Sequence, residues 1–385
     1  MVHARRQGST GRLLTIAGSL LALAIAGCGL SDRSGQDGVE TVQSAINGGW
    51  TTLTLINGWQ SAGSAYNVPA VGIVNGVVVF RGALTASAPY NNAAFALPSA
   101  FAPADHMGNP DSAAVRMKIV LSGGAGGSLT YDPFTKLMTI SQDGMAPTDI
   151  GPASTMFTSL EGASFDVNVG TAVDAPGWNG WYTWRPNEGQ SEGFVKNVDG
   201  FIRFQGLLAK SLDDDFNNHI FTIPSQYRPG QIVQVYANIG HISEPNGWSI
   251  ITIYPSGDVW VDGNAADTWI HGVHLEGVSF SKTNTGNVAL PLSNGWAAYS
   301  PRQVKVGNFG GVIRLQGAIS GGTSTTIGTL PAGMRPAKTV IVPTISYGTT
   351  AWITMSPSGV MTVNNPGGLS VATMFLSLDG VSYGL

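Results

Sequence analysis

The densest group of oxygen-bearing side chains in the sequence is the run from Asp213 to Asn218, which reads Asp-Asp-Asp-Phe-Asn-Asn. Asp213, Asp215 and Asn217 match the alternate ligand positions at the start of a calcium-binding loop. The glycine expected at the sixth position of such a loop is replaced by Asn218, and Pro224 stands where the closing glutamate belongs. We therefore interpret the cluster as a solvated loop rather than as a calcium site.

The histidines offer no better metal-ligand pattern. His271 and His274 are three residues apart, and on a strand this spacing places their side chains on opposite faces. We expect each of the two to be a surface or half-buried ring. Outside the predicted leader, His106, His219 and His241 have no recognisable metal-ligand spacing with a cysteine or another histidine. The sequence therefore predicts no metal site and no cofactor.

The sequence also lacks a recognisable set of catalytic residues. Three serines recur outside any Gly-x-Ser-x-Gly setting, so they are not expected to be nucleophiles; they are Ser164, Ser279 and Ser382. An acidic residue recurs before a glycine, at Glu161, Glu276 and Asp379. We expect these acids to form turns or to accept hydrogen bonds between domains, and we predict no catalytic residue.

The aromatic residues give the best indication of a binding surface. The sequence has ten tryptophans and ten tyrosines. Trp59, Trp181 and Trp296 recur in register, so we expect them in cores or at domain corners. Aromatic residues that do not recur are better ligand candidates, because exposed indoles stack on sugar rings and are costly to expose without use. These candidates are Trp178, Tyr182, Trp184, Trp248, Trp260 and Trp269.

These side chains must be positioned by a module that the sequence repeats three times. The closing motif Leu-Glu-Gly-Ala-Ser-Phe at residues 160–165 returns in related form at residues 275–280 and 378–383. An opening motif, Asn-Gly-Trp, precedes each closing motif, at residues 57–59, 179–181 and 294–296. Such repetition predicts tandem structural units. We place the three modules at residues 49–166, 176–281 and 290–385, with linkers near residues 166–175 and 281–290, where small and polar residues cluster.

Within each module the residue pattern predicts antiparallel β-structure. Ile250, Thr252 and Tyr254 alternate with Ile251 and Ile253, as expected for the two faces of one strand. Short runs of β-branched and aromatic residues are separated by Gly, Pro, Asn and Ser, and no helical apolar spacing is found after residue 50. We therefore predict an all-β chain of three tandem β-sandwich, jelly-roll-like modules.

A pair of polar residues recurs on a predicted strand of the second and third modules. Arg203 with Gln205, and Arg314 with Gln316, are spaced by two and so share a strand face. One interpretation is a solvent-facing surface. The other is a polar seam where modules meet, because the planar guanidinium of arginine suits interfaces.

Residues 1–27 are predicted to be a leader. Three arginines precede an apolar stretch that is too short to span a bilayer with ease. The small residues before Cys28 resemble the lipobox of bacterial lipoproteins, in which this thiol is lipidated and becomes the first mature residue. A plain secretory signal and a transmembrane anchor are the alternatives. Residues 28–48 are expected to be a flexible tether.

Charge excludes one class of partner. The leader holds three of the 19 Lys and Arg residues and none of the 23 Asp and Glu residues, so the rest of the chain has a net charge of −7. With no basic run, we expect no nucleic-acid partner. The expected location is the cell envelope, at the outer membrane or cell surface rather than the inner membrane, with attachment to the membrane through lipid.

The repeated motifs together resemble a known family. Asn-Gly-Trp, a strand ending in glycine, a Pro-x-x-Φ-Arg-Pro bracket such as Pro331 to Pro336, a Pro-Ser-Gly turn and the closing motif look like the C-terminal modules of tailed-phage tail-fibre and receptor-binding proteins. The resemblance implies β-sandwich or jelly-roll heads that commonly act as trimers on cell-surface saccharide or protein. Because three copies lie in one chain, we expect a monomer whose modules pack about a pseudo-threefold axis, the alternative being a linear array.

The sequence leaves three functions to compare. The first is a lipid-anchored, non-enzymatic surface protein that uses its modules for adhesion or carbohydrate binding. The second is a structural role in the envelope or in a phage-tail-like assembly. The third, a glycan hydrolase, requires two carboxylates across a cleft and is least favoured, because charged residues make up only 11% of the chain.

Overall fold

The structure is a computed structural model of the 385-residue chain. Residues from Thr41 to Leu385 form one compact unit. The residues that the structure describes are 47–87, 91–103, 115–122, 125–142, 155–167, 171–173, 181–183, 193–198, 200–210, 218–239, 247–262, 272–282, 287–346, 349–364 and 370–385.

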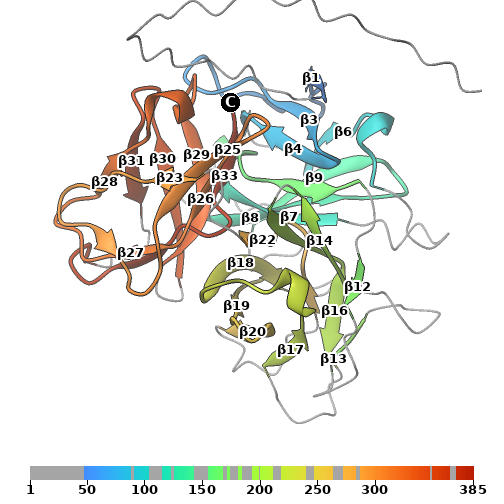
Figure 1. The fold of residues 1–385 in the computed structure, drawn as a ribbon. Coiled ribbons are helices and arrows are strands. Elements are labelled where there is room, and N and C mark those ends of the chain that lie inside the picture. The colour runs from blue at the N-terminus through green and yellow to red at the C-terminus, as the bar shows by residue number, and fades with distance from the viewer. Residues whose placement is uncertain are drawn as a thin grey trace, which may run out of the picture. The chain divides into compact units, whose positions relative to one another are not determined.

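The described residues form six antiparallel sheets, two in each of three repeated modules, as the sequence predicts. Module 1 (residues 47–167, blue to green in Figure 1) has a four-stranded sheet of order β1-β3-β4-β11 and a seven-stranded sheet of order β2-β5-β10-β7-β8-β9-β6. Its strands are β1 (Asn47–Thr52), β2 (Gln60–Ser61), β3 (Ala70–Val74), β4 (Val77–Arg81), β5 (Ala83–Ser87), β6 (Ala93–Ala96), β7 (Val115–Leu121), β8 (Gly126–Tyr131), β9 (Leu137–Gln142), β10 (Thr155–Ser159) and β11 (Ser164–Asp166).

Module 2 (residues 171–282, green to yellow in Figure 1) repeats both sheets, in the orders β12-β14-β15-β22 and β13-β16-β21-β18-β19-β20-β17. Its strands are β12 (Thr171–Val173), β13 (Trp181–Thr183), β14 (Gly193–Val198), β15 (Phe201–Gln205), β16 (Leu207–Lys210), β17 (His219–Thr222), β18 (Val233–Ile239), β19 (Gly247–Ile253), β20 (Asp258–Asp262), β21 (Gly272–His274) and β22 (Ser279–Ser281).

Module 3 (residues 287–385, orange to red in Figure 1) repeats them again, in the orders β23-β25-β26-β33 and β24-β27-β32-β29-β30-β31-β28. Its strands are β23 (Val288–Ala289), β24 (Ala297–Ala298), β25 (Lys305–Phe309), β26 (Val312–Gln316), β27 (Ala318–Ser320), β28 (Thr326–Thr329), β29 (Val340–Ser346), β30 (Thr349–Met355), β31 (Val360–Asn364), β32 (Phe375–Ser377) and β33 (Ser382–Gly384). Both β12 and β23 lie in segments that we expected to link the modules; each is the edge strand of a smaller sheet.

The recurring sequence motifs have defined structural tasks. In the opening motif, Asn57 and Gly58 both have positive φ angles, 55° and 81°, which suits a tight Asn-Gly turn. The next residue, Trp59, is 3% exposed and donates its indole N–H to the carbonyl of Asn91 at 2.8 Å. Trp296 repeats this arrangement at 4% exposure, so the expected core role is confirmed for these two tryptophans. The side chain of Trp181 lies outside the described residues.

The proline brackets are short 3₁₀ turns, which are η1 (Ser99–Phe101), η5 (Ser225–Tyr227) and η6 (Ala332–Met334). In modules 2 and 3 the bracket arginine turns back onto the chain just before it. Arg228 donates to the carbonyl of Ile223 at 3.2 Å, and Arg335 donates to the carbonyl of Leu330 at 3.1 Å. These arginines therefore hold a turn, which explains why they recur without any need for a ligand.

Each module has its own hydrophobic core between its two sheets. In module 1 the rings of Phe80, Phe95 and Phe165 lie together, and Phe204 occupies the same place in module 2, against Phe221 and Phe280. Burying such rings stabilises each module by the largest single contribution available to a sandwich.

The modules also contact one another through equivalent elements. Strands β7, β18 and β29, which occupy the same position in the three larger sheets, contact each other in pairs. A separate apolar cluster joins Val74, Val77 and Val79 of module 1 to Val312 of module 3, with Val198 of module 2 packed against it. Equivalent elements of the three modules therefore meet in a cyclic set of pairwise contacts, as the hypothesis of a pseudo-trimer within one chain requires.

The third strand in the order of each smaller sheet, which is β4, β15 or β26, is called its middle strand, and a glycine follows it. The backbone conformation at this position requires glycine. Gly317 has a φ of 97°, and a Cβ atom there would lie 2.2 Å from the carbonyl oxygen of Gln303. We expect Gly317→Ala to lower stability by roughly 2 kcal/mol or more, because it adds a steric clash to an unfavourable backbone conformation. The measurement is the midpoint of urea or thermal unfolding.

A matched control is Gly333→Ala. No atom lies within 4 Å of a Cβ placed at Gly333, so this variant should unfold near the wild-type midpoint. Equal losses in the two variants would contradict the steric explanation.

Candidate functional site

Of the six aromatic residues predicted to bind ligand, the structure describes one side chain. Trp178, Trp184 and Trp269 lie outside the described residues, as does Cys28. Tyr182 in β13 and Trp248 in β19 have described backbones, but their side chains are not described. The remaining candidate, Trp260, lies in β20 and is half-buried.

Trp260 belongs to a row of paired residues that crosses four neighbouring strands of module 2. It pairs with Thr252 of β19 on one side and with His219 of β17 on the other. Thr252 in turn pairs with Gln234 of β18. Paired residues project from the same face of a sheet, and the ring centroids of His219 and Trp260 lie 5.2 Å apart. We call Gln234, Thr252, Trp260 and His219 the module 2 row.

A carboxylate lies beside the outer end of this row. Asp258 accepts hydrogen bonds from the hydroxyls of Ser256 at 2.7 Å and Thr222 at 2.8 Å. Nε2 of His219 lies 3.5 Å from the same carboxylate, whose side chain is 40% exposed. The hydrogen bonds from Ser256 and Thr222 lower the pKa of Asp258, so it is ionised at neutral pH.

The inner end of the row meets module 3 through Gln234. Its side-chain carbonyl accepts from Arg302 at 3.1 Å, and its backbone carbonyl accepts from the hydroxyl of Ser377 at 2.6 Å. Its backbone N–H donates to Asp379 at 3.4 Å, and its side-chain amide donates to Thr252 at 3.3 Å. Gln234 therefore couples the module 2 row to the boundary with module 3.

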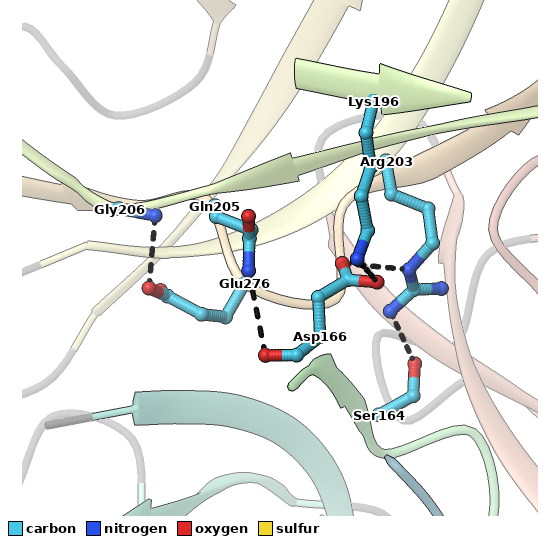
Figure 2. Close-up of polar contacts among 7 residues, drawn as sticks. All are labelled: Ser164, Asp166, Lys196, Arg203, Gln205, Gly206 and Glu276. Atoms are coloured by element: carbon cyan, nitrogen blue, oxygen red, sulfur yellow. Dashed lines mark hydrogen bonds and ion pairs between the residues drawn. The ribbon is translucent and has the colours of Figure 1, made fainter. Parts of the chain in front are cut away.

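The boundary between modules 1 and 2 is the polar seam considered in the sequence. Arg203 of β15 donates to Oδ2 of Asp166 and to the hydroxyl of Ser164, both at 3.0 Å (Figure 2). Lys196 of β14 approaches Oδ1 of Asp166 at 2.7 Å, and Gln205 donates to the backbone carbonyl of Asp166 (Figure 2). Arg203 and Asp166 are 2% and 1% exposed, so removing either would leave a buried charge without its main partner.

Arg314 also lies at a module boundary. Its guanidinium stacks at 4.1 Å from the ring of Phe201 in module 2, and Phe201 packs edge-on at 4.4 Å against Phe309 of module 3. The interface interpretation of the two arginines is therefore correct, and the solvent-facing interpretation is wrong.

The recurring acids cap strand ends in all three modules. Each accepts a hydrogen bond from the backbone N–H of the glycine that ends the middle strand of the smaller sheet: Glu161 from Gly82 at 2.8 Å, Glu276 from Gly206 at 2.9 Å and Asp379 from Gly317 at 2.7 Å. Asp379 also accepts from Gln234 of module 2. Both expected roles, as turn formers and as interdomain acceptors, are confirmed in Asp379.

Burial gives these acids unusual proton affinities. Loss of solvation raises the pKa of Glu161 and of Glu276 to about 7, and that of Asp379 to about 6. Hydrogen bonds from the glycine N–H groups oppose this shift without cancelling it. Three groups at module boundaries therefore change charge near neutral pH.

The environment of His274 differs from our expectation. We expected a surface or half-buried ring, but His274 is 4% exposed in β21. It precedes Glu276 by two residues, and the same position is Ser159 in module 1 and Ser377 in module 3. Ser159 donates to the carbonyl of Ile341 at 2.6 Å, so this position is part of a module boundary and is buried for that reason. His271 lies outside the described residues.

Two carboxylates line a small cavity among the three modules. Glu276 and Asp379 reach it together with Lys118 and Tyr236, and its volume is about 40 Å³. This volume holds a few water molecules but no sugar ring. Within the described residues, no group of three or more His, Cys, Asp or Glu side chains is placed to hold a metal ion.

Two further results concern membrane-spanning helices and known proteins. No helix among the described residues is long and apolar enough to cross a membrane. The chain matches no protein-family model, no curated protein and no solved structure. The candidate site must therefore be judged on its own geometry.

Mild acid should stabilise the folded chain. The raised carboxyl pKa values mean that the folded state binds more protons than the unfolded state between about pH 4.5 and 7, so stability rises as the pH falls through this window. Each fully buried group contributes on the order of 1–3 kcal/mol. Melting temperatures measured from about pH 8 to about pH 5 should increase.

Two variants separate this effect from others. Glu161→Gln keeps an acceptor for Gly82 but cannot take up a proton, so its melting temperature should depend less on pH. Asp132→Asn is the control: Asp132 lies in an exposed turn, where partial burial raises its pKa but hydrogen bonds from Thr135 and Phe134 lower it further. A pH dependence unchanged in Glu161→Gln would show that Glu161 is not responsible.

Proposed function

We propose that the protein is a non-enzymatic binding protein of the cell envelope, anchored through a lipid on Cys28, which displays three fused β-modules for adhesion to saccharide. The observation that carries this proposal is the distribution of roles among repeated residues. Residues that recur, such as Arg203, Glu276 and Trp59, are used in boundaries, turns and cores. Polar and aromatic residues found in one module only are left to recognise a partner.

The geometry gives little support to hydrolysis. A glycoside hydrolase places two carboxylates on either side of a cleft that admits the sugar. Among the described residues, Glu276 and Asp379 share a cavity, and that cavity is too small for a sugar ring. Both also accept hydrogen bonds from strand-end glycines, which fixes them in structural positions.

A structural envelope role is the second candidate, because the modules already bury long polar seams against each other. A surface able to close on Asp166 and Gln234 within one chain is chemically suited to closing on a neighbouring protein as well. The two candidates differ in whether the chain recognises free saccharide.

The anchor can be tested by detergent phase partition. Wild-type protein should enter the detergent phase, because lipidation of Cys28 with more than one acyl chain would give stable anchoring. The Cys28→Ala variant has no thiol to lipidate, so it should enter the aqueous phase or keep its leader. Ser31→Ala, in the same expected tether, should behave as wild type. Recovery of mature wild-type protein in the aqueous phase would overturn the anchor.

The ligand class can be tested with the full chain in detergent on a glycan array. We expect saturable binding to a restricted group of saccharides, with signal lost after heat unfolding. Absence of binding to every saccharide, together with stable association with envelope proteins, would replace adhesion by the structural role.

A further inference from the structure

We propose that each chain carries one saccharide site, on module 2, in which Trp260 stacks on a sugar ring and Asp258 accepts hydrogen bonds from the hydroxyl or amino groups of the sugar. This inference rests on the proposed function and names the place and the ligand chemistry of that binding. The residues that form it come from three adjacent strands, β17, β19 and β20, and from the turn between β19 and β20.

The first argument is the arrangement of rings. Trp260 and Tyr254 project from the same face of the sheet, because Trp260 pairs with Thr252 and Tyr254 follows Thr252 by two residues. Tyr254 is 37% exposed, and Trp260 is half-buried beside His219. One of these rings lies in β20 and the other directly after the adjacent strand β19. Two aromatic side chains on one face, with Thr252 beside them, form a surface of the kind on which a pyranose ring packs.

The second argument is the polar group beside the rings. The carboxylate oxygens of Asp258 accept hydrogen bonds from the hydroxyls of Ser256 and Thr222, so the orientations of both hydroxyls are fixed. The hydroxyl of Ser256 also accepts the backbone N–H of Asp258 at 3.4 Å, and Nε2 of His219 lies 3.3 Å from the hydroxyl of Thr222. The carboxylate of Asp258 has further lone pairs, and its side chain is 40% exposed, so it is accessible to a ligand donor. The site therefore offers the oriented carboxylate of Asp258 two residues from Trp260, on the same face of β20.

The third argument is that the fold does not need these residues. At the position of Trp260, module 1 has Thr139 and module 3 has Thr362, yet the equivalent strand pairings form in both. The other site positions differ in the same way; His219 corresponds to Ala93 and Thr326, Asp258 to Leu137 and Val360, and Thr222 to Ala96 and Thr329. Only module 2 combines a ring, an acid and a histidine at these positions.

The charge of the site limits the ligand class. Asp258 is ionised, and although Arg228 is close enough to lower its pKa further, the chain without its expected leader is acidic, with a net charge of −7. An acidic polysaccharide would meet repulsion at the carboxylate, whereas neutral or amino sugars can donate hydrogen bonds to it. We therefore assign neutral and amino sugars to the site and exclude uronate-rich chains.

The test is titration of the full chain in detergent, followed by tryptophan fluorescence. The probes are oligomers of glucose and of N-acetylglucosamine, with polygalacturonate as the acidic comparator. Trp260→Thr, which installs the residue of modules 1 and 3, should weaken binding at least about tenfold, the factor expected when one ring-stacking contact is lost. Asp258→Asn should weaken it by about threefold to tenfold.

The matched control is Trp352→Ala. Trp352 is a half-buried tryptophan of β30, in the same sheet of module 3, so this variant should keep wild-type affinity. Unchanged melting temperatures would confirm that each variant is folded. Binding that survives Trp260→Thr, or that favours polygalacturonate, overturns the site and leaves the proposed function standing. Failure of every saccharide to bind the wild-type chain overturns the proposed function itself.

Discussion

The buried acid at the end of each module is the interaction on which the rest of the structure depends. Glu161, Glu276 and Asp379 each hold the glycine N–H that ends a strand of their own module. Because these turns lie where modules meet, the same carboxylate that fixes the local chain also fixes the surface offered to the neighbour. Asp379 shows this most directly, since its second oxygen accepts the N–H of Gln234. Local turn geometry and module packing are therefore a single constraint.

Most of the fold could be predicted from repetition. A motif that returns three times with its glycine and its tryptophan in place must have the same local structure each time, and Trp59 and Trp296 show this directly. The alternation from Ile250 to Tyr254 likewise predicted which side chains share a face of the strand, and the face with Ile251 and Ile253 is the one that packs in the core. These features depend on neighbours close in sequence, which is why sequence patterns identify them. The edge strands β12 and β23 are short and lack such a pattern, so their segments were interpreted as linkers.

The candidate site was harder to predict because its residues meet through strand pairing. Trp260 was identified as an unrepeated aromatic, but His219 and Asp258 join it only because β17 and β20 are adjacent. Comparison of the copies position by position would have revealed them, since Ala93 and Thr326 stand at the position of His219, and Leu137 and Val360 at that of Asp258. The buried position of His274 was missed for a related reason: its neighbours belong to another module, and spacing within one strand does not indicate them.

Carrying three modules in one chain has a consequence for how the protein can change. Asp166, Ser281 and Gly384 occupy the same position, each pairing with the first residue of the middle strand of its smaller sheet. Only Asp166 carries a carboxylate at this position, so the three boundaries are chemically different. Three identical chains would repeat the acid at every boundary and could not vary one alone. The molecule is in effect a heterotrimer encoded by one gene, with a fixed order of subunits and three surfaces that can diverge independently.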